Sequence, residues 1–353
     1  MRTASRPAVG RCLAGGRLSL PFPLRWALLV ATCSAVMGCA IDPKLDLEEL
    51  APESGPLILQ SVPFYPQTEY QCGPAALAGV LGESGVGISP EQLTPQVYLP
   101  ERQGSLQVEL LAATRRAGRI AYVVDTEPSS LIRELQADRP VLVLQNLRTP
   151  RFPVWHYAVV IGFDAAANDF ILNSGKHERM EERASTFLRT WDWAERWGMV
   201  ALEPGDLPSS PDRLRYYQAV AAFESLADDN AVHKAWSAAL TEWPNDYRPG
   251  LALGNLAYQA ANYESAIRHF RQALKLSPGE AVVENNLAEA MAAIGCPKTA
   301  EQRLSSFLAN LSEDSPWRAD LIATLNGLYA LPGKDLPTCG EPQSTTPSSP
   351  SVK

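Results

Sequence analysis

Metal-ligand clusters, long apolar runs and an excess of basic charge are all missing from this chain of 353 residues. Its four histidines and six cysteines include no pair at the short spacing of a metal site, so we expect neither a metal nor a cofactor. Only residues 26–37 form a strongly apolar run, and this run is too short to cross a bilayer. The formal net charge of −8 disfavours nucleic acid as a partner, because phosphates bind basic surfaces.

The start of the chain has the pattern of an export signal. Residues 1–25 contain five arginines and no acid, and the apolar run that follows ends in Val36-Met37-Gly38-Cys39. This ending resembles the bacterial lipobox, which implies a signal peptide over 1–38 and a lipid anchor on Cys39. Alanine rather than aspartate at position 40, directly after this cysteine, resembles the pattern of lipoproteins that are sent to the outer membrane. We therefore expect the protein in the bacterial cell envelope, at the periplasmic face of the outer membrane. An ordinary signal peptide is the alternative.

The mature chain has few cysteines, and their number favours one free thiol. Cys39, Cys72, Cys296 and Cys339 follow the predicted signal peptide. If Cys39 is acylated, at most one disulfide forms in an oxidising compartment. Cys296 and Cys339 both lie in the C-terminal half and are candidates to pair, which leaves Cys72 free.

Cys72-Gly73-Pro74 and His156 form the candidate catalytic pair. Proline suits the first turn of a helix, so we expect a helix to begin at Cys72. The backbone donors of that turn, together with an imidazole, lower the pKa of a thiol. His156 opens an apolar strand that would aim its ring. The pattern therefore predicts a low-pKa thiolate nucleophile at Cys72 and a base at His156.

Two further residues complete the predicted site. Gln67 lies on the approach to the helix and is expected to supply an oxyanion donor. Asn173, on the strand after the histidine, is expected to orient the imidazole, with Asp164 as the rival orienter. His177 is the rival base, although the charged residues 176–183 are expected to form a mobile surface loop.

The hydrophobic pattern of residues 57–204 predicts an α+β domain, with helices first and then a largely antiparallel sheet. Ser89 and Ser105 are expected to cap two of its helices. The other helices are expected over 73–81, 130–137 and 185–197, and the strands over 57–64, 120–124, 141–144, 156–163, 170–173 and 199–202.

The stretches 62–67, 72–77 and 156–164 together resemble the papain-like cysteine peptidases of the bacteriocin-processing, double-glycine type. The resemblance covers about 57–204 and implies helices packed on an antiparallel sheet. It also implies that Gln67 builds the oxyanion hole, that Cys72 attacks and that His156 is the base. Asn173 stands where the family often has the Asp of an Asp-Pro pair. Cleavage of double-glycine leaders is not implied, because the membrane transporter of the exporter members is not found here.

Residues 213–314 repeat with a spacing of 34. Pro244 matches Pro278, and Gly254 matches Ala288 at points where two helices must touch closely. The pattern resembles tetratricopeptide repeats, which implies an all-α superhelix with a groove for a protein partner. An unrelated helical bundle is the alternative. The three expected helical pairs are 213–246, 247–280 and 281–314.

These patterns predict a membrane-anchored, periplasm-facing cysteine peptidase with a Cys-His-Asn site, acting on a peptide or protein substrate. The repeats are expected to recruit the substrate or a partner protein. One alternative is a non-catalytic lipoprotein scaffold that binds partners through its repeats, and another is a thiol-dependent amidase or acyltransferase. The remaining expected segments are a tether (39–56), a linker (205–212) and a C-terminal segment (315–353) that is disordered after about 331.

Overall fold

The structure, a computed structural model, describes residues 55–66 and 71–330. The predicted signal peptide, Cys39, Gln67, Cys339 and the segment after residue 330 lie outside the described residues. Predictions about these parts therefore stay predictions. Within the described residues, no helix is both long and apolar enough to span a bilayer.

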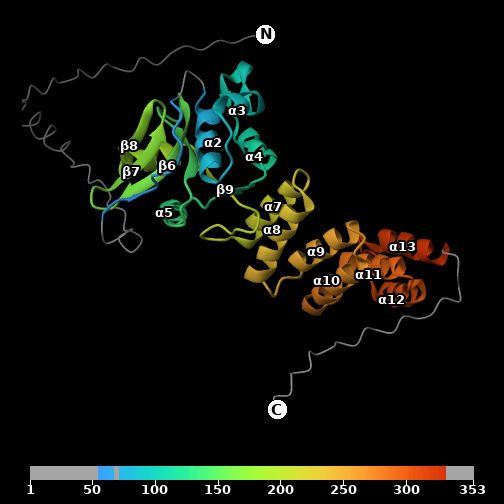
Figure 1. Ribbon diagram of the computed structural model, residues 1–353. Helices are drawn as coiled ribbons and strands as arrows, with labels where there is room; N and C mark the ends of the chain where they lie inside the picture. The colour runs from blue at the N-terminus through green and yellow to red at the C-terminus, as the bar shows by residue number, and fades with distance from the viewer. Residues whose placement is uncertain (1–54, 67–70, 331–353) are drawn as a thin grey trace, which may run out of the picture. The chain divides into compact units, whose positions relative to one another are not determined.

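An antiparallel sheet forms the centre of the first domain (Figure 1). In the described residues it has seven strands, in the order β4-β9-β5-β6-β7-β8, and β1 pairs with β6. A separate two-stranded sheet joins β2 and β3. The strands are β1 (Leu57–Ile58), β2 (Tyr98–Leu99), β3 (Gly104–Ser105), β4 (Ile120–Val123), β5 (Val141–Asn146), β6 (Trp155–Asp164), β7 (Asp169–Ser174), β8 (His177–Arg183) and β9 (Gly198–Leu202).

Helix α2 (Cys72–Glu83) is the buried helix of this domain. Nine of its twelve residues are buried, which requires packing on more than one side. It contacts β6 and the helix α3 (Pro90–Val97), and α4 (Gln107–Arg116) lies next to both helices (Figure 1). This packing brings the first residue of α2, Cys72, close to the start of β6. The domain is completed by a 3-10 turn (Pro100–Arg102), α5 (Pro128–Gln136) and α6 (Ala184–Asp192).

Most of the predicted elements are present, and the α+β class is confirmed. Ser89 caps α3 through a full capping box, as predicted. The cap predicted at Ser105 is wrong, because this residue belongs to β3 and α4 begins after Leu106. The predicted loop over 176–183 is also wrong. Residues 177–183 form the edge strand β8, whose charged side chains are mostly exposed, and exposed charge is common on edge strands.

The C-terminal part of the described chain is all helical, as the repeat pattern predicted (Figure 1). Each helix contacts the next. A side chain at Gly254 would overlap the Phe270 ring, which explains why a glycine stands there. The seventh helix, α13, was not predicted. The helices are α7 (Arg213–Glu224), α8 (Asp229–Glu242), α9 (Tyr247–Gln259), α10 (Tyr263–Leu276), α11 (Ala281–Ala293), α12 (Pro297–Asn310) and α13 (Arg318–Ala330).

The cysteines of the described residues differ in state. Cys296 is in a disulfide, whereas Cys72 is free. The cysteine bonded to Cys296 lies outside the described residues, so the pairing with Cys339 stays a prediction. A free thiol at position 72 is what a nucleophile requires.

Candidate active site

Cys72 and His156 line one cavity of about 920 Å³. This size is at the upper end of the range for ligand sites, and the cavity is large enough for several residues of a peptide. Three chain segments form its walls around the cysteine and the start of β6. They are the turn and strand before α4 (Arg102–Gln107), the residues that lead into β6 (Pro153–Tyr157) and the end of the α6 region (Trp193–Glu195).

Cys72 is half-buried at the N-terminus of α2. Burial raises the pKa of this thiol above its ordinary value, because a thiolate loses hydration there. Hydrogen bonds from the backbone N–H groups of Tyr157 and Gly73 to the sulfur lower the pKa, but they offset burial only in part. The expected low pKa is therefore wrong, because burial outweighs these hydrogen bonds and the net shift of the Cys72 pKa is upward.

The imidazole of His156 is held by a hydroxyl. Its Nε2 lies 2.9 Å from Oγ of Ser174. Burial lowers the pKa of His156, since no charged group offsets the lost hydration of an imidazolium. A neutral ring that donates its Nε2–H to Oγ keeps Nδ1 unprotonated. With this tautomer, the cavity that Cys72 and His156 line contains a thiol and an unprotonated ring nitrogen.

Asn173 does not take the position that the sequence predicted for it. It pairs with Val159 on β6, so its side chain lies on the opposite face of the sheet from that of His156. Its Oδ1 accepts a hydrogen bond from the backbone N–H of Arg179 at 3.1 Å. Ser174, one residue later, is on the face of His156 and makes the contact instead.

The alternative orienter, Asp164, and the alternative base, His177, have other positions in the structure. Asp164 Oδ1 accepts from the backbone N–H groups of Ala166 and Ala167 and so closes the turn between β6 and β7. His177 is exposed at the start of β8 and does not line the cavity. Gln67 lies outside the described residues, so its role stays a prediction. No cluster of three or more potential metal ligands occurs among the residues that the structure describes.

Sequence reasoning missed the contribution of two serines. Ser174 directly follows a predicted site residue, and only the strand register identifies it as the partner of the histidine. Ser105 packs against Gly73, where any side chain would overlap its Oγ. The glycine after the cysteine is thus needed for close packing at the start of α2.

The raised pKa of Cys72 predicts how the thiol responds to pH. At about pH 7 its thiolate fraction should be smaller than that of a free cysteine, whose pKa is about 8.5. The rate of alkylation by iodoacetamide should therefore still be rising above about pH 9. Intact-mass measurement of the rate across pH tests this, with the urea-unfolded chain as the reference thiol. A plateau at lower pH than in the unfolded chain would contradict it.

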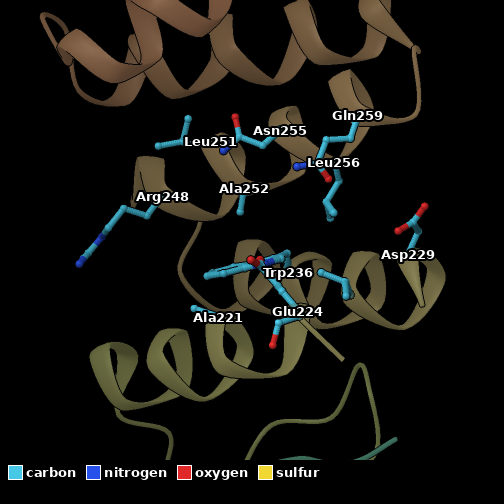
Figure 2. A pocket seen from close by; sticks show the side chains of 12 residues that line it. Ala221, Glu224, Asp229, Trp236, Arg248, Leu251, Ala252, Asn255, Leu256 and Gln259 are labelled. Carbon is cyan, nitrogen blue, oxygen red and sulfur yellow. The ribbon is translucent and has the colours of Figure 1, made fainter. Parts of the chain in front are cut away.

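A second pocket, here called the repeat pocket, lies among α7, α8 and α9 (Figure 2). Its volume is about 470 Å³. Trp236 lies at its centre and donates a hydrogen bond to Glu224, and Leu251 and Leu256 come from α9. Asn255, also in its wall, accepts a hydrogen bond from Asn286 at 2.8 Å. Apolar and polar groups are therefore mixed in this pocket, and neither a cysteine nor a histidine is among the residues that line it.

Comparison with known proteins matches residues 59–198 to the Peptidase_C39 like family. This segment includes both Cys72 and His156. No curated protein matches the chain.

Solved structures resemble separate parts of the chain. A putative C39-like peptidase from Bacillus anthracis is 16% identical, with a TM-score of 0.35, over 42% of this chain and 98% of its own. A double glycine motif protease from an AMS/PCAT transporter, solved with the leader peptide, is 21% identical, with a TM-score of 0.31, over 42% and 96%. The TPR2B domain of yeast Sti1, from its pHsp70 complex, is 13% identical, with a TM-score of 0.31, over 33% and 95%.

Proposed function

Since residues 59–198 match the Peptidase_C39 like family and helical repeats follow them, we propose that this chain hydrolyses peptide bonds with Cys72 as nucleophile and His156 as base. The observation that carries the proposal is the shared cavity of these two residues, together with the hydroxyl that holds the imidazole. A thiol and a positioned base in one accessible cavity are the minimum for acyl transfer through sulfur.

The first half of the reaction forms a thioester. Sγ of Cys72 attacks the carbonyl carbon of the substrate while the thiol proton passes to Nδ1 of His156. The oxyanion formed is stabilised by the backbone N–H groups of Cys72 and Gly73, which are directed at the sulfur in the resting site and have no backbone acceptor in the first turn of the helix. The imidazolium then protonates the amine as the C–N bond breaks, and the amine leaves.

The second half regenerates the thiol. Water attacks the thioester carbonyl and gives one proton to His156. Collapse of the second oxyanion breaks the C–S bond, and the sulfur takes the proton back from the imidazolium. The products are a carboxylic acid and an amine, so the net change is the addition of one water to the peptide bond.

Digestion of a peptide library derived from a bacterial proteome tests this function. Mass spectrometry is expected to find new N-termini at a restricted set of sequences. Prior alkylation of the only free cysteine in the described residues should prevent them. If amines in the buffer are joined to the new C-termini instead of water, the chain is a transferase. If no peptide changes under any condition, the peptidase proposal fails.

Ser174 is proposed as the residue that orients His156. A neutral hydroxyl fixes the tautomer but stabilises an imidazolium less than a carboxylate does, in agreement with the lowered pKa of His156. Ser174→Ala is expected to lower kcat/KM by about tenfold, roughly the value of one hydrogen bond to a charged group. Ser174→Thr should restore activity because it keeps the hydroxyl.

Two comparisons separate orientation from a structural effect. Ser174→Asp should raise the pKa of His156, so that the acid limb of the kcat/KM profile moves to higher pH. Asn173→Ala should leave that limb in place, since this side chain does not contact the ring. A profile that moves with Asn173→Ala and not with Ser174→Asp would assign the role to the asparagine.

We also propose roles for the N-terminal segment and the helical repeats, which would position the peptidase domain and its substrate. The arginine-rich start and the Gly38-Cys39 junction support a lipid anchor in the cell envelope, with the peptidase facing the periplasm. Mass spectrometry of the mature N-terminus for diacylglycerol on Cys39 tests the anchor. The mixed apolar and polar lining of the repeat pocket supports binding of a peptide segment from a partner or substrate.

A further inference from the structure

Residues 147–155, which are the connection between β5 and β6 and the first residue of β6, expose a cluster of bulky apolar side chains; we call this segment the arm. Leu147 is 49% exposed, Phe152 63%, Val154 45% and Trp155 54%. Of the twelve large hydrophobic side chains that are exposed in the described residues, these four fall within nine consecutive positions. A cluster of this kind marks an interaction surface, whereas single exposed apolar side chains do not.

Hydrogen bonds at its base hold the arm in one conformation. The buried side chain of Asn146 accepts from the backbone N–H groups of Arg148 and Val154 and donates to the carbonyl of Thr149. The backbone N–H of Phe152 is also bonded to Thr149. Two prolines, at 150 and 153, restrict the backbone further. Because the arm is ordered before binding, its apolar groups lose little conformational entropy when a partner covers them.

The arm is basic although the chain is acidic. Arg148 and Arg151 are both exposed, and neither forms an ion pair with another described residue. The guanidinium of Arg151 lies over the ring of Phe152, 5.7 Å from its centroid. Two arginines beside apolar groups fit a partner that combines bulky apolar side chains with a carboxylate.

The arm is continuous with the active-site cavity. Pro153, Val154 and Trp155 line the cavity that contains Cys72, while Leu147 and Phe152 lie outside its lining. A polypeptide held at the sulfur would therefore meet the apolar part of the arm as it leaves the cavity. A membrane is the alternative partner, but a bilayer would cover only the exposed side chains of the arm. It would not account for the fact that the arm continues into the cavity that contains Cys72.

We propose that the arm is a docking surface for the substrate, which is an extended polypeptide with bulky apolar side chains and an acidic residue beside them. This inference rests on the proposed peptidase function. The apolar side chains pack on Phe152 and Val154, and the carboxylate pairs with Arg148 or Arg151. The arm thus selects substrates by a segment adjacent to the scissile bond.

Binding to the full chain carrying Cys72→Ala tests the docking without turnover. The probes are fluorescein-labelled peptides of sequence Gly-Ser-Asp-Leu-Phe-Leu-Ser-Gly, a version with Lys for Asp and a version with Ser-Ser-Ser for Leu-Phe-Leu. Fluorescence anisotropy should rank the first peptide as the tightest. The double change Phe152→Ser and Val154→Ser should weaken it about tenfold or more, the effect typical of losing buried anchor residues. Arg148→Glu with Arg151→Glu should reverse the preference for Asp over Lys.

A matched change of an exposed apolar side chain elsewhere is the control. Ile322, on α13, is 41% exposed, and Ile322→Ser should leave all three affinities unchanged. Equal affinities in the arm variants and the control would overturn the proposal. So would arm variants that bind the peptides normally but no longer sediment with vesicles of phosphatidylethanolamine and phosphatidylglycerol, since the arm would then be a membrane contact.

The two proposals fail in different ways. Arm-dependent binding by the Cys72→Ala chain, with no hydrolysis by the unmodified chain, removes the peptidase function and keeps a peptide-binding arm. Hydrolysis with the same KM in the unmodified chain and in the arm variants removes the docking surface and keeps the peptidase.

Discussion

Replacing Cys72 with alanine is expected to abolish peptide hydrolysis, with kcat/KM falling by about 10⁴-fold or more. The change removes the atom that forms the thioester, and no other described cysteine is free to replace it. The cavity and the helix that begins at residue 72 should persist, because alanine favours a helix and is close to cysteine in size. Steady-state cleavage of a peptide from the library measures the loss.

A change at the other end of the same helix is the control. Ser84 follows α2 and donates to the carbonyl of Leu81, outside the cavity. Ser84→Ala should cost a little stability and keep kcat/KM within a factor of about three, as expected for one local hydrogen bond. Residual cleavage by the Cys72→Ala chain at more than a few per cent would mean that another group is the nucleophile.

Replacing His156 with glutamine is expected to lower kcat/KM by about 10²–10⁴-fold, the usual contribution of a general base. The effect should depend on pH in a defined direction. The base acts only when unprotonated, and burial lowers its pKa, so the unmodified chain should stay active below about pH 6.5, the ordinary pKa of histidine. Activity should fall only as the pH passes through the lowered pKa, and the variant should lack this acid limb.

The exposed histidine of β8 provides the comparison. His177→Gln should change neither the rate nor the acid limb, because His177 does not line the cavity. If the His177→Gln chain lost activity and the His156→Gln chain kept it, His177 would be the base instead of His156. An acid limb that remains in His156→Gln would mean that another group controls it.

The sequence was sufficient to predict the elements that carry Cys72 and His156. A glycine and a proline after a cysteine indicate a helix start, and an apolar run after a histidine indicates a buried strand. These are local patterns, and the structure places them as expected. The thiolate state was not predictable in this way, because burial depends on residues that are distant in the sequence and here outweighs the helix N-terminus.

The identity of the residue that contacts His156 depends on the register between β6 and β7, and the sequence does not show this register. A shift of one residue changes the face on which a side chain lies. The pairing of β6 with β7 is irregular between Val160 and Gly162, so counting residues from His156 does not give the correct face. Asn173 and Ser174 were therefore indistinguishable by spacing, and only the structure separates them. The misassigned loop over 176–183 has a related cause, since charged side chains on an edge strand resemble a solvated loop.

The raised pKa of Cys72 has a consequence for the lifetime of the protein. Peroxide and other oxidants attack the thiolate, and the first product, a sulfenic acid, is readily converted into irreversible forms. A cysteine with a raised pKa exposes less of the thiolate at a given pH. The burial that raises this pKa is therefore expected to slow oxidation of the nucleophile between turnovers.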